Sequence, residues 1–316
     1  MATRKKVEAP LKQITLHQHD LANFLACPRK YDLSNNLGYY PRKFSNALNI
    51  GDLFAKCAFW LHQGKDINEC LVYVKRIQDD IHKVVRNQSM ADDMETNVVI
   101  TQAMLNGYNE RFIVNYKQSV PIIAELLPEY KIENKMKYAG YEFTYVCRLD
   151  GRIVDDKGNI WVLELKTTSL MDKNLLDKLP TNFQINSYWN AAETKEGKPV
   201  AGVLYRYILK PSLRQKKNET LDQYRKRIML DYTTYPEGYF YEQSIYFSRP
   251  SLDEFKKDLQ SYIEDLSRCY ILNKWTKRGT ACESKFGLCQ YIKYCGDPTQ
   301  ETLNTYFQKG ESDATI

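Results

Sequence analysis

Two stretches of the sequence decide the fold: Cys147-Arg-Leu-Asp-Gly-Arg-Ile-Val154 and Ile160-Trp-Val-Leu-Glu-Leu-Lys-Thr-Thr168. The first lies in a segment, 130–154, that is rich in Tyr, Phe, Val and Ile, and the second contains Ile160, Trp161, Val162 and two threonines; such residues favour strands. The segment between them, Asp155-Asp-Lys-Gly-Asn159, is a strong turn signal. The sequence therefore predicts an antiparallel hairpin.

The second strand of this hairpin carries two charged side chains in an apolar setting. Because side chains alternate faces along a strand, Glu164 and Lys166 share one face, while Leu163 and Leu165 point into a core. A turn centred on Lys157 places the Glu164 side chain opposite a residue of the first strand, Asp150.

Directly opposed residues have Cβ atoms about 5 Å apart. Two carboxylates at that distance repel each other unless a cation lies between them, and an oxygen-rich pair suits Mg²⁺ or Mn²⁺. Lys166 beside the pair would orient a water or neutralise a phosphate. The alternative is an exposed strand face on which Lys166 forms a surface ion pair.

The rest of the chain alternates between helical and strand patterns. Apolar spacings of three and four predict a short helix that begins near Asp20, its expected N-cap, and a long helical region from Gly51 to about Leu127. Two strands follow over 130–154. Beyond the hairpin we expect a helix over 182–193, a strand over 203–209 and a last helix over 252–272. Residues 1–13 are a polar lead-in.

Length and composition bound the class of protein. The chain has 316 residues, of which 43% are hydrophobic and 27% charged, and this excludes collagen-like and largely disordered chains. No apolar run approaches the ~18 residues that a membrane span needs. The basic N-terminus lacks the apolar stretch of a secretory signal, so we expect a cytoplasmic protein, or one in the host cytoplasm if it is viral.

Charge and aromatic content permit nucleic acid as a partner without requiring it. The formal net charge is +6, and 24 tyrosines suit either base stacking or an ordinary core. The basic stretch from Pro211 to Lys226 is either a solvated loop or helix face or a surface that follows phosphates.

The eight cysteines indicate metal ligation or inert burial rather than a disulfide framework. Cys282, Cys289 and Cys295 cluster near the C-terminus, and Cys27 lies far upstream. Four thiolates bind either a tetrahedral zinc or an iron–sulfur cluster, and their spacing does not choose between the two. The others fall in helical or strand patterns and are expected in the core; they are Cys57, Cys70, Cys147 and Cys269.

Together the hairpin and the helix that follows resemble the PD-(D/E)XK nuclease superfamily, in particular its RecB-like branch. Asp150 and Glu164-Leu-Lys166 match the acidic residue and the E-x-K pair, and Gln184-Ile-Asn-Ser-Tyr188 matches the Q-x-x-x-Y motif. The resemblance implies an α/β fold, with a restriction-endonuclease-like α-β-β-β-α-β core, a large helical insertion and a helical C-terminal segment.

The same resemblance assigns roles to the site residues. Asp150, Glu164 and the Leu165 carbonyl would bind Mg²⁺ or Mn²⁺, and Lys166 would assist catalysis. Gln184 and Tyr188 would contact DNA or order the active site.

One residue departs from the family pattern. Family members often carry a metal-binding histidine in a G-x-x-x-H context, but here Gly51-Asp-Leu-Phe54 is followed by Ala55. Asp52 would be a substitute offset by about 60° around the helix, and His62 is more distant.

The cysteine arrangement resembles the iron–sulfur nucleases of the RecB-like branch, such as AddB-type and CRISPR-associated four-cysteine nucleases. In these, one cysteine precedes the nuclease core and three follow it. A 4Fe–4S cluster on Cys27, Cys282, Cys289 and Cys295 would then clasp the two ends of the chain together, with zinc as the alternative.

These expectations divide the chain into an N-terminal segment (1–50), a helical subdomain (51–128), the nuclease core (129–210), a helical and cysteine-bearing region (211–308) and a flexible tail (309–316). The expected function is metal-dependent DNA cleavage by an exonuclease that acts in recombination, repair or replication. A phage or another virus is one expected source of such an enzyme. Recombination or replication proteins would be its partners. Two rivals are a catalytically weak DNA-binding or assembly factor, and a zinc-stabilised interaction protein.

Overall fold

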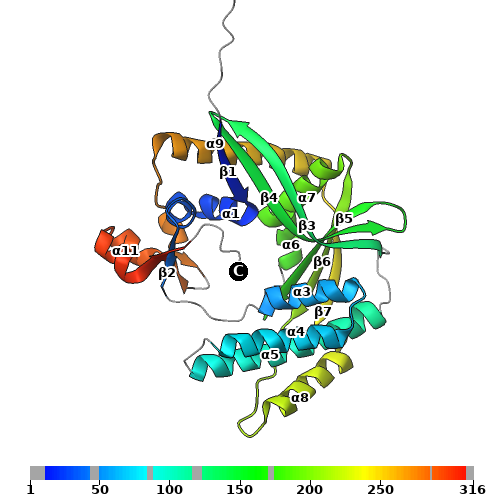
Figure 1. Ribbon diagram of the computed structural model, residues 1–316. Helices are drawn as coiled ribbons and strands as arrows, with labels where there is room; N and C mark the ends of the chain where they lie inside the picture. Colours follow the sequence, from blue (N-terminus) through cyan, green and yellow to red (C-terminus); the bar gives the residue numbers. More distant parts are fainter. Residues whose placement is uncertain are drawn as a thin grey trace, which may run out of the picture.

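The computed structural model describes residues 11–42, 50–83, 88–115, 123–169, 174–284 and 287–310. Within them a six-stranded sheet forms the centre of the molecule (Figure 1). Its strands are β1 (Lys12–His17), β3 (Ile123–Tyr138), β4 (Tyr141–Asp155), β5 (Ile160–Thr168), β6 (Val200–Leu209) and β7 (Phe240–Ile245).

The long strand β4 organises this sheet. On one side it pairs with β3 in antiparallel register along almost its whole length. On the other side its first half pairs with β1 in parallel and its second half with β5 in antiparallel register. β6 then runs parallel to β5, and β7 closes the edge. β4 therefore changes partner in the middle of the sheet.

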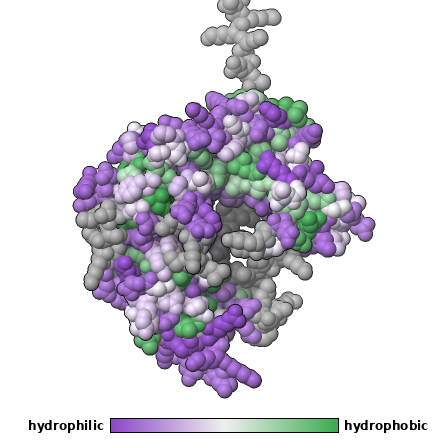
Figure 2. Space-filling view, turned by 180° about the vertical axis from the view of Figure 1, so that it is seen from behind, coloured by the Kyte–Doolittle hydropathy of each residue, from purple (hydrophilic) through white to green (hydrophobic). Residues whose placement is uncertain are grey.

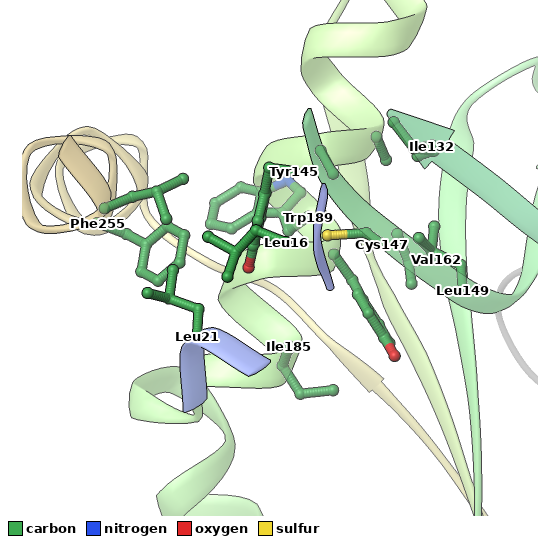
Figure 3. Packing of buried hydrophobic residues seen from close by; sticks show 14 of the residues in the cluster. Leu16, Leu21, Ile132, Tyr145, Cys147, Leu149, Val162, Ile185, Trp189 and Phe255 are labelled. Atoms are coloured by element: carbon green, nitrogen blue, oxygen red, sulfur yellow. The ribbon is translucent and has the colours of Figure 1, made fainter. Parts of the chain in front are cut away.

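Helices cover both faces of the sheet. One layer holds α3 (Ile50–His62), α4 (Ile67–His82), α5 (Gln88–Asn109) with its π-helical extension (Glu110–Val114), and α8 (Leu221–Thr234), and its core includes Leu163 and Leu165. The other holds α1 (Gln18–Ala26), α7 (Phe183–Glu196) and α9 (Arg249–Leu272). Figure 3 shows side chains of this second core, among them Leu16, Tyr145 and Trp189, pointing toward one another.

Local hydrogen bonds and a left-handed glycine explain why the expected hairpin (β4–β5) and the expected helix α7 form. The Asp155 carboxylate accepts hydrogen bonds from the backbone N–H groups of Lys157 and Asn159, and Gly158 takes the left-handed conformation that closes the turn, with φ 79°. α7 begins after Asn182, whose side chain accepts from the Ile185 amide, and ends at a left-handed Gly197.

The two ends of the described chain form one small module on the side of the sheet (Figure 1). β2 (Tyr39–Pro41) pairs with β10 (Phe307–Lys309) in antiparallel register. Tyr31 stacks on Trp275 at 5.8 Å between ring centroids. The remaining short elements are α2 (Pro28–Tyr31), a π-helical turn (Asp32–Asn36), α6 (Leu175–Lys178), 3₁₀ turns (Leu179–Thr181, Pro236–Gly238 and Gly279–Ala281), β8 (Glu283–Ser284), β9 (Gly287–Leu288), α10 (Ile292–Gly296) and α11 (Gln300–Tyr306).

The expected α/β, restriction-endonuclease-like fold is confirmed, and so are the hairpin, α7, β6 and α9. Three local expectations were wrong. Residues 12 and 13 belong to strand β1 rather than to a polar lead-in, because β4 offers them a parallel partner. The helical pattern does not extend to Leu127, since β3 begins at Ile123 and pairs with β4. The N-cap of α1 is His17, and Asp20 lies in the first turn, where its carboxylate accepts from the His17 amide at 2.9 Å.

Other expectations fall at the chain ends. Lys309, expected in the tail, lies in β10. Residues 1–10 and 311–316 lie outside the described residues.

Candidate active site

The two acidic residues meet where β4 parts from β5. The β4–β5 ladder pairs Gly151 with Leu163, and one more step in the same register places Asp150 opposite Glu164. Beyond this point β4 pairs with β1, as Val146 does with His17. The Leu165 amide, which no longer faces a β4 carbonyl in the ladder, donates a 2.6 Å hydrogen bond to Oδ2 of Asp150.

Glu164 is buried and Asp150 is half-buried, and the charge of Asp150 disfavours the charge of Glu164. Glu164 is 3% exposed, and its Oε2 has no hydrogen-bond partner among the described residues. Burial, followed by the charge of Asp150, raises the pKa of Glu164 well above its ordinary value. Burial also raises the pKa of Asp150, although the Leu165 amide and Lys166 act in the opposite direction. The site is therefore built to receive positive charge.

Lys166 supplies a cation at the exposed edge of this pair. Its side chain is exposed, and its charge lowers the pKa of both Asp150 and Glu164. Lys166 therefore lies between the solvent and the two carboxyls.

Gln184 and Tyr188 come to the same place from α7. Gln184 Nε2 donates to Tyr188 Oη at 3.0 Å, as expected for residues four apart on a helix. Burial raises the pKa of Tyr188, and the charges of Glu164 and Asp150 raise it further. The motif side chains that the sequence singled out are thus brought to one site.

A further tyrosine at the site was missed from the sequence. Tyr205 of β6 stands beside Glu164 in the parallel β5–β6 register and is 4% exposed. Burial raises its pKa, and the charges of Glu164 and Asp150 add to the effect. The sequence predicts the strand Val203–Leu209 that contains Tyr205. Only the register of β6 on β5 shows which residue of that strand lies beside the carboxyls.

The helix expected to carry a metal-binding histidine presents other residues. Ala55 packs against the helical core. His62 is held away from the carboxyls, with Nε2 2.9 Å from Tyr108 Oη and 3.0 Å from Arg206 Nη1. Asp52, in the first turn of α3, lies near enough for its charge to raise the pKa of Asp150.

The residues present fit a divalent cation. No three His, Cys, Asp or Glu side chains in the described ranges are arranged around a ready metal position. Nevertheless, the unbonded Oε2 of Glu164 and the raised pKa values of two opposed carboxyls suit this pair to a bound cation. Asp150, Glu164 and the Leu165 carbonyl would hold such an ion.

Four cysteine thiols gather in the terminal module. The pKa of Cys295 is raised first by burial and also by Cys289, Cys27 and Cys282, which therefore lie around it. The Cys289 amide donates to the Cys282 carbonyl at 2.8 Å, and none of the four is in a disulfide. Within the described residues, no three of these thiols are placed as ligands of one metal ion. The four other cysteines are buried or half-buried, three of them fully.

The second half of the basic stretch after Pro211 is paired with its own acids. Arg227 bonds Glu219 through two nitrogens at 2.7 Å, and Arg225 and Lys226 both contact Asp222. This pairing favours the solvated loop and helix over a surface that follows phosphates.

Comparison with known proteins identifies the family. A family model described as "PD-(D/E)XK nuclease superfamily" matches residues 16–296. The chain therefore belongs to the PD-(D/E)XK nuclease superfamily, whose members are nucleases that typically use Mg²⁺ or Mn²⁺.

Two further comparisons add less. No curated protein matches the chain. A solved structure described as "Crystal structure of SSO0001" aligns with 14% identity over 81% of this chain and 88% of the other, with a TM-score of 0.28. No helix in the described ranges combines the length and apolarity that a membrane span requires.

Proposed function

We propose that this protein is a divalent-metal-dependent deoxyribonuclease of the RecB-like branch, acting as an exonuclease in DNA recombination, repair or replication. The observation that carries the proposal is the pairing of buried Glu164 with half-buried Asp150, with an unbonded Glu164 oxygen and the exposed Lys166 at its edge. A buried acid beside a second carboxyl costs stability, and in a nuclease fold catalysis is the best explanation of such a pair.

The residues of the site divide the work of phosphodiester hydrolysis. Asp150, oriented by the Leu165 amide, and Glu164 would hold Mg²⁺ or Mn²⁺, which supplies an activated water and charge stabilisation when bound. Lys166 would neutralise charge on the scissile phosphate. Gln184 and Tyr188 would order the substrate against the carboxyls through their mutual hydrogen bond.

We further propose that Cys27, Cys282, Cys289 and Cys295 bind a 4Fe–4S cluster, with zinc as the alternative. The gathering of the other three cysteines around Cys295 supports this. Such a cluster would reinforce contacts that the terminal segments already make, such as the β2–β10 pairing. We also propose that the chain divides at residues 50, 128, 210 and 308. The same proposal includes a cytoplasmic location and partners from recombination or replication.

Ala55 supports a second candidate function, that of a DNA-binding or assembly factor. Ala55 stands where family members often carry a metal-binding histidine. A chain with weakened metal binding would serve as a DNA-binding or assembly factor that keeps the nuclease fold.

Cleavage of end-labelled linear and circular DNA by anaerobically purified protein tests both functions. With Mg²⁺ or Mn²⁺, we expect degradation of linear DNA only, with the label giving the polarity. Loss of activity in Asp150→Asn would assign the cleavage to this site. Cutting of circular DNA would make the enzyme an endonuclease, and no cleavage with either metal would favour the binding factor.

A further inference from the structure

A groove outside the catalytic pair combines aromatic rings with cationic side chains. It lies between α3 and α4, has a volume of about 540 Å³, and is lined by Lys56, Trp60, Lys65, Glu69, Val72, Tyr73 and Arg76. The volume falls within the roughly 300–1,000 Å³ of typical ligand pockets.

The aromatic pair forms the floor of the groove. Trp60 and Tyr73 are half-buried against the helical core, with ring centroids 4.8 Å apart. Half-burial fixes each ring from below while leaving part of it open. Such rings are suited to stacking on flat, aromatic ligands.

The cations lie over these rings. Lys65 Nζ lies 3.8 Å from the Trp60 centroid, and Lys56 Nζ lies 5.0 Å from that of Tyr73. Arg76 also approaches Tyr73, at 5.8 Å, and its charge, after that of Lys83, lowers the pKa of the Asp80 carboxyl. Glu69 is the one acid among the described residues of the lining. A ligand with negative charge and flat rings would satisfy both sets of groups.

Helix α3 carries residues of both the groove and the neighbourhood of the candidate active site. Asp52, Lys56 and Trp60 follow one another at intervals of four residues and so lie on one side of the helix. Asp52 is close enough to influence the pKa of Asp150. Trp60 lies about 12 Å further along the axis, at ~1.5 Å per residue. That span equals roughly three or four nucleotides at the ~3.4 Å spacing of a stacked strand.

We propose that the Trp60–Tyr73 groove binds single-stranded DNA, with bases stacking on the two rings and Lys56, Lys65 and Arg76 taking phosphates. The position of the groove relative to the cut phosphate rests on the proposed nuclease function, whereas strand binding itself does not. The groove would set the length of single strand that the enzyme holds beside its catalytic site.

Tryptophan fluorescence provides a direct test without cleavage. The other tryptophans are buried, at 3% exposure for Trp161, 2% for Trp189 and 7% for Trp275, so stacking of a base should quench mainly Trp60. Titration of the full chain in EDTA with a twelve-residue oligo(dT) should quench the wild type. Trp60→Phe should lose the quench while keeping the fold, and Trp60→Ala should bind about tenfold more weakly.

Salt dependence tests the cations separately. In Lys56→Gln/Lys65→Gln, the slope of log affinity against log salt should fall by about 1.4, at ~0.7 for each phosphate contact of a single strand. The matched control Lys195→Gln/Lys257→Gln, on exposed parts of α7 and α9, should keep the wild-type slope. Tyr235→Ala removes an aromatic ring that is 63% exposed elsewhere and should not alter binding.

Several outcomes would overturn the proposal: an unchanged quench in Trp60→Phe, wild-type affinity in Trp60→Ala, or equal Trp60-dependent binding of duplex DNA. Cleavage separates this inference from the proposed function. If wild-type protein cuts DNA with Mn²⁺ and Trp60→Ala raises KM for a twelve-residue strand but not for a dinucleotide, both stand. If the variants cut and bind as the wild type does, only the groove assignment fails. If nothing cuts but the Trp60-dependent quench is present, only the nuclease function fails.

Discussion

The backbone amide of Leu165 donates its hydrogen bond to the side chain of Asp150, 2.6 Å away, at the point where β4 exchanges β5 for β1. The Leu165 amide would otherwise continue the β4–β5 hydrogen-bond ladder. Here it orients the Asp150 carboxyl instead. The same step in the register places Glu164 beside it. The change of partner of β4 is thus what brings the half-buried carboxyl of Asp150 against the buried carboxyl of Glu164.

Removal of the Lys166 ammonium should affect catalysis and not folding, because this side chain is exposed. Lys166→Ala should lower the rate of DNA cleavage by roughly 100-fold or more, the usual cost of losing one group that stabilises transition-state charge. The melting temperature should stay within about 2 °C of the wild type. Lys157→Ala, an exposed lysine in the turn of the same hairpin, is the matched control and should cleave normally. Equal rates in the two variants would remove Lys166 from the mechanism.

Mn²⁺ should stabilise the protein through Glu164. At a concentration of Mn²⁺ 100 times its Kd, linkage adds about 2.7 kcal/mol, or about 4 °C for a chain of this length. Glu164→Gln keeps the shape of the side chain but should lose this shift in differential scanning fluorimetry. Glu254→Gln, at an exposed position on α9, should retain it. A shift that persists in Glu164→Gln would show that the ion binds elsewhere.

The cysteine site should contribute to stability as well as hold metal. Cys27→Ala should lower the melting temperature by about 5 °C and reduce the bound metal, since thiolate-bound metals add to folding free energy. Iron and acid-labile sulfide analysis of anaerobically purified protein would indicate a cluster, and stoichiometric zinc would indicate the alternative. Cys269→Ala, on α9, should keep both properties. An unchanged melting temperature and metal content in Cys27→Ala would contradict the proposed clasp.

Half-buried His62 should make the folding stability fall in mild acid. Burial, followed by the charge of Arg206, lowers the pKa of His62 to about 3. The folded protein thus keeps this ring neutral while the unfolded chain protonates it below about pH 6.5. The stability linked to it is present above pH 6.5 and is lost as the pH falls toward 3, by about 2 kcal/mol at pH 5.

Urea unfolding at pH 7 and pH 5 measures this loss. His62→Gln should reduce it, whereas His19→Gln should enlarge it, because a hydrogen bond with Asp20 raises the pKa of His19 and so stabilises the fold in acid. The same pH dependence in wild type and His62→Gln would mean that other groups account for acid sensitivity.

Much of the site could be predicted because its determinants are local in the sequence. The turn at Asp155–Asn159 fixes the hairpin, and strand alternation then sets Glu164 against Asp150 and turns Leu163 and Leu165 into the core. The four-residue spacing of Gln184 and Tyr188 likewise places both side chains on one face of α7, where they bond each other. Short-range geometry leaves little freedom in such cases.

What the sequence could not predict depends on pairing between distant segments. β1 was missed because Lys12–His17 becomes a strand only when β4, more than a hundred residues later, provides a partner. Tyr205 reaches the carboxyls through the β5–β6 register, and Asp52 does so through the packing of α3. The fork of β4 between β1 and β5 has no local signal at all.

The sequence by itself therefore determined the hairpin, its acidic pair and the helical motif beside it, because turns, alternation and helical spacing act over a few residues. Only the tertiary structure decided how far the two carboxyls are buried, that Tyr205 lies beside them, and that α3 brings Asp52 near them. Those features follow from the pairing and packing of remote segments, whose free energy is gained only once the whole sheet has formed.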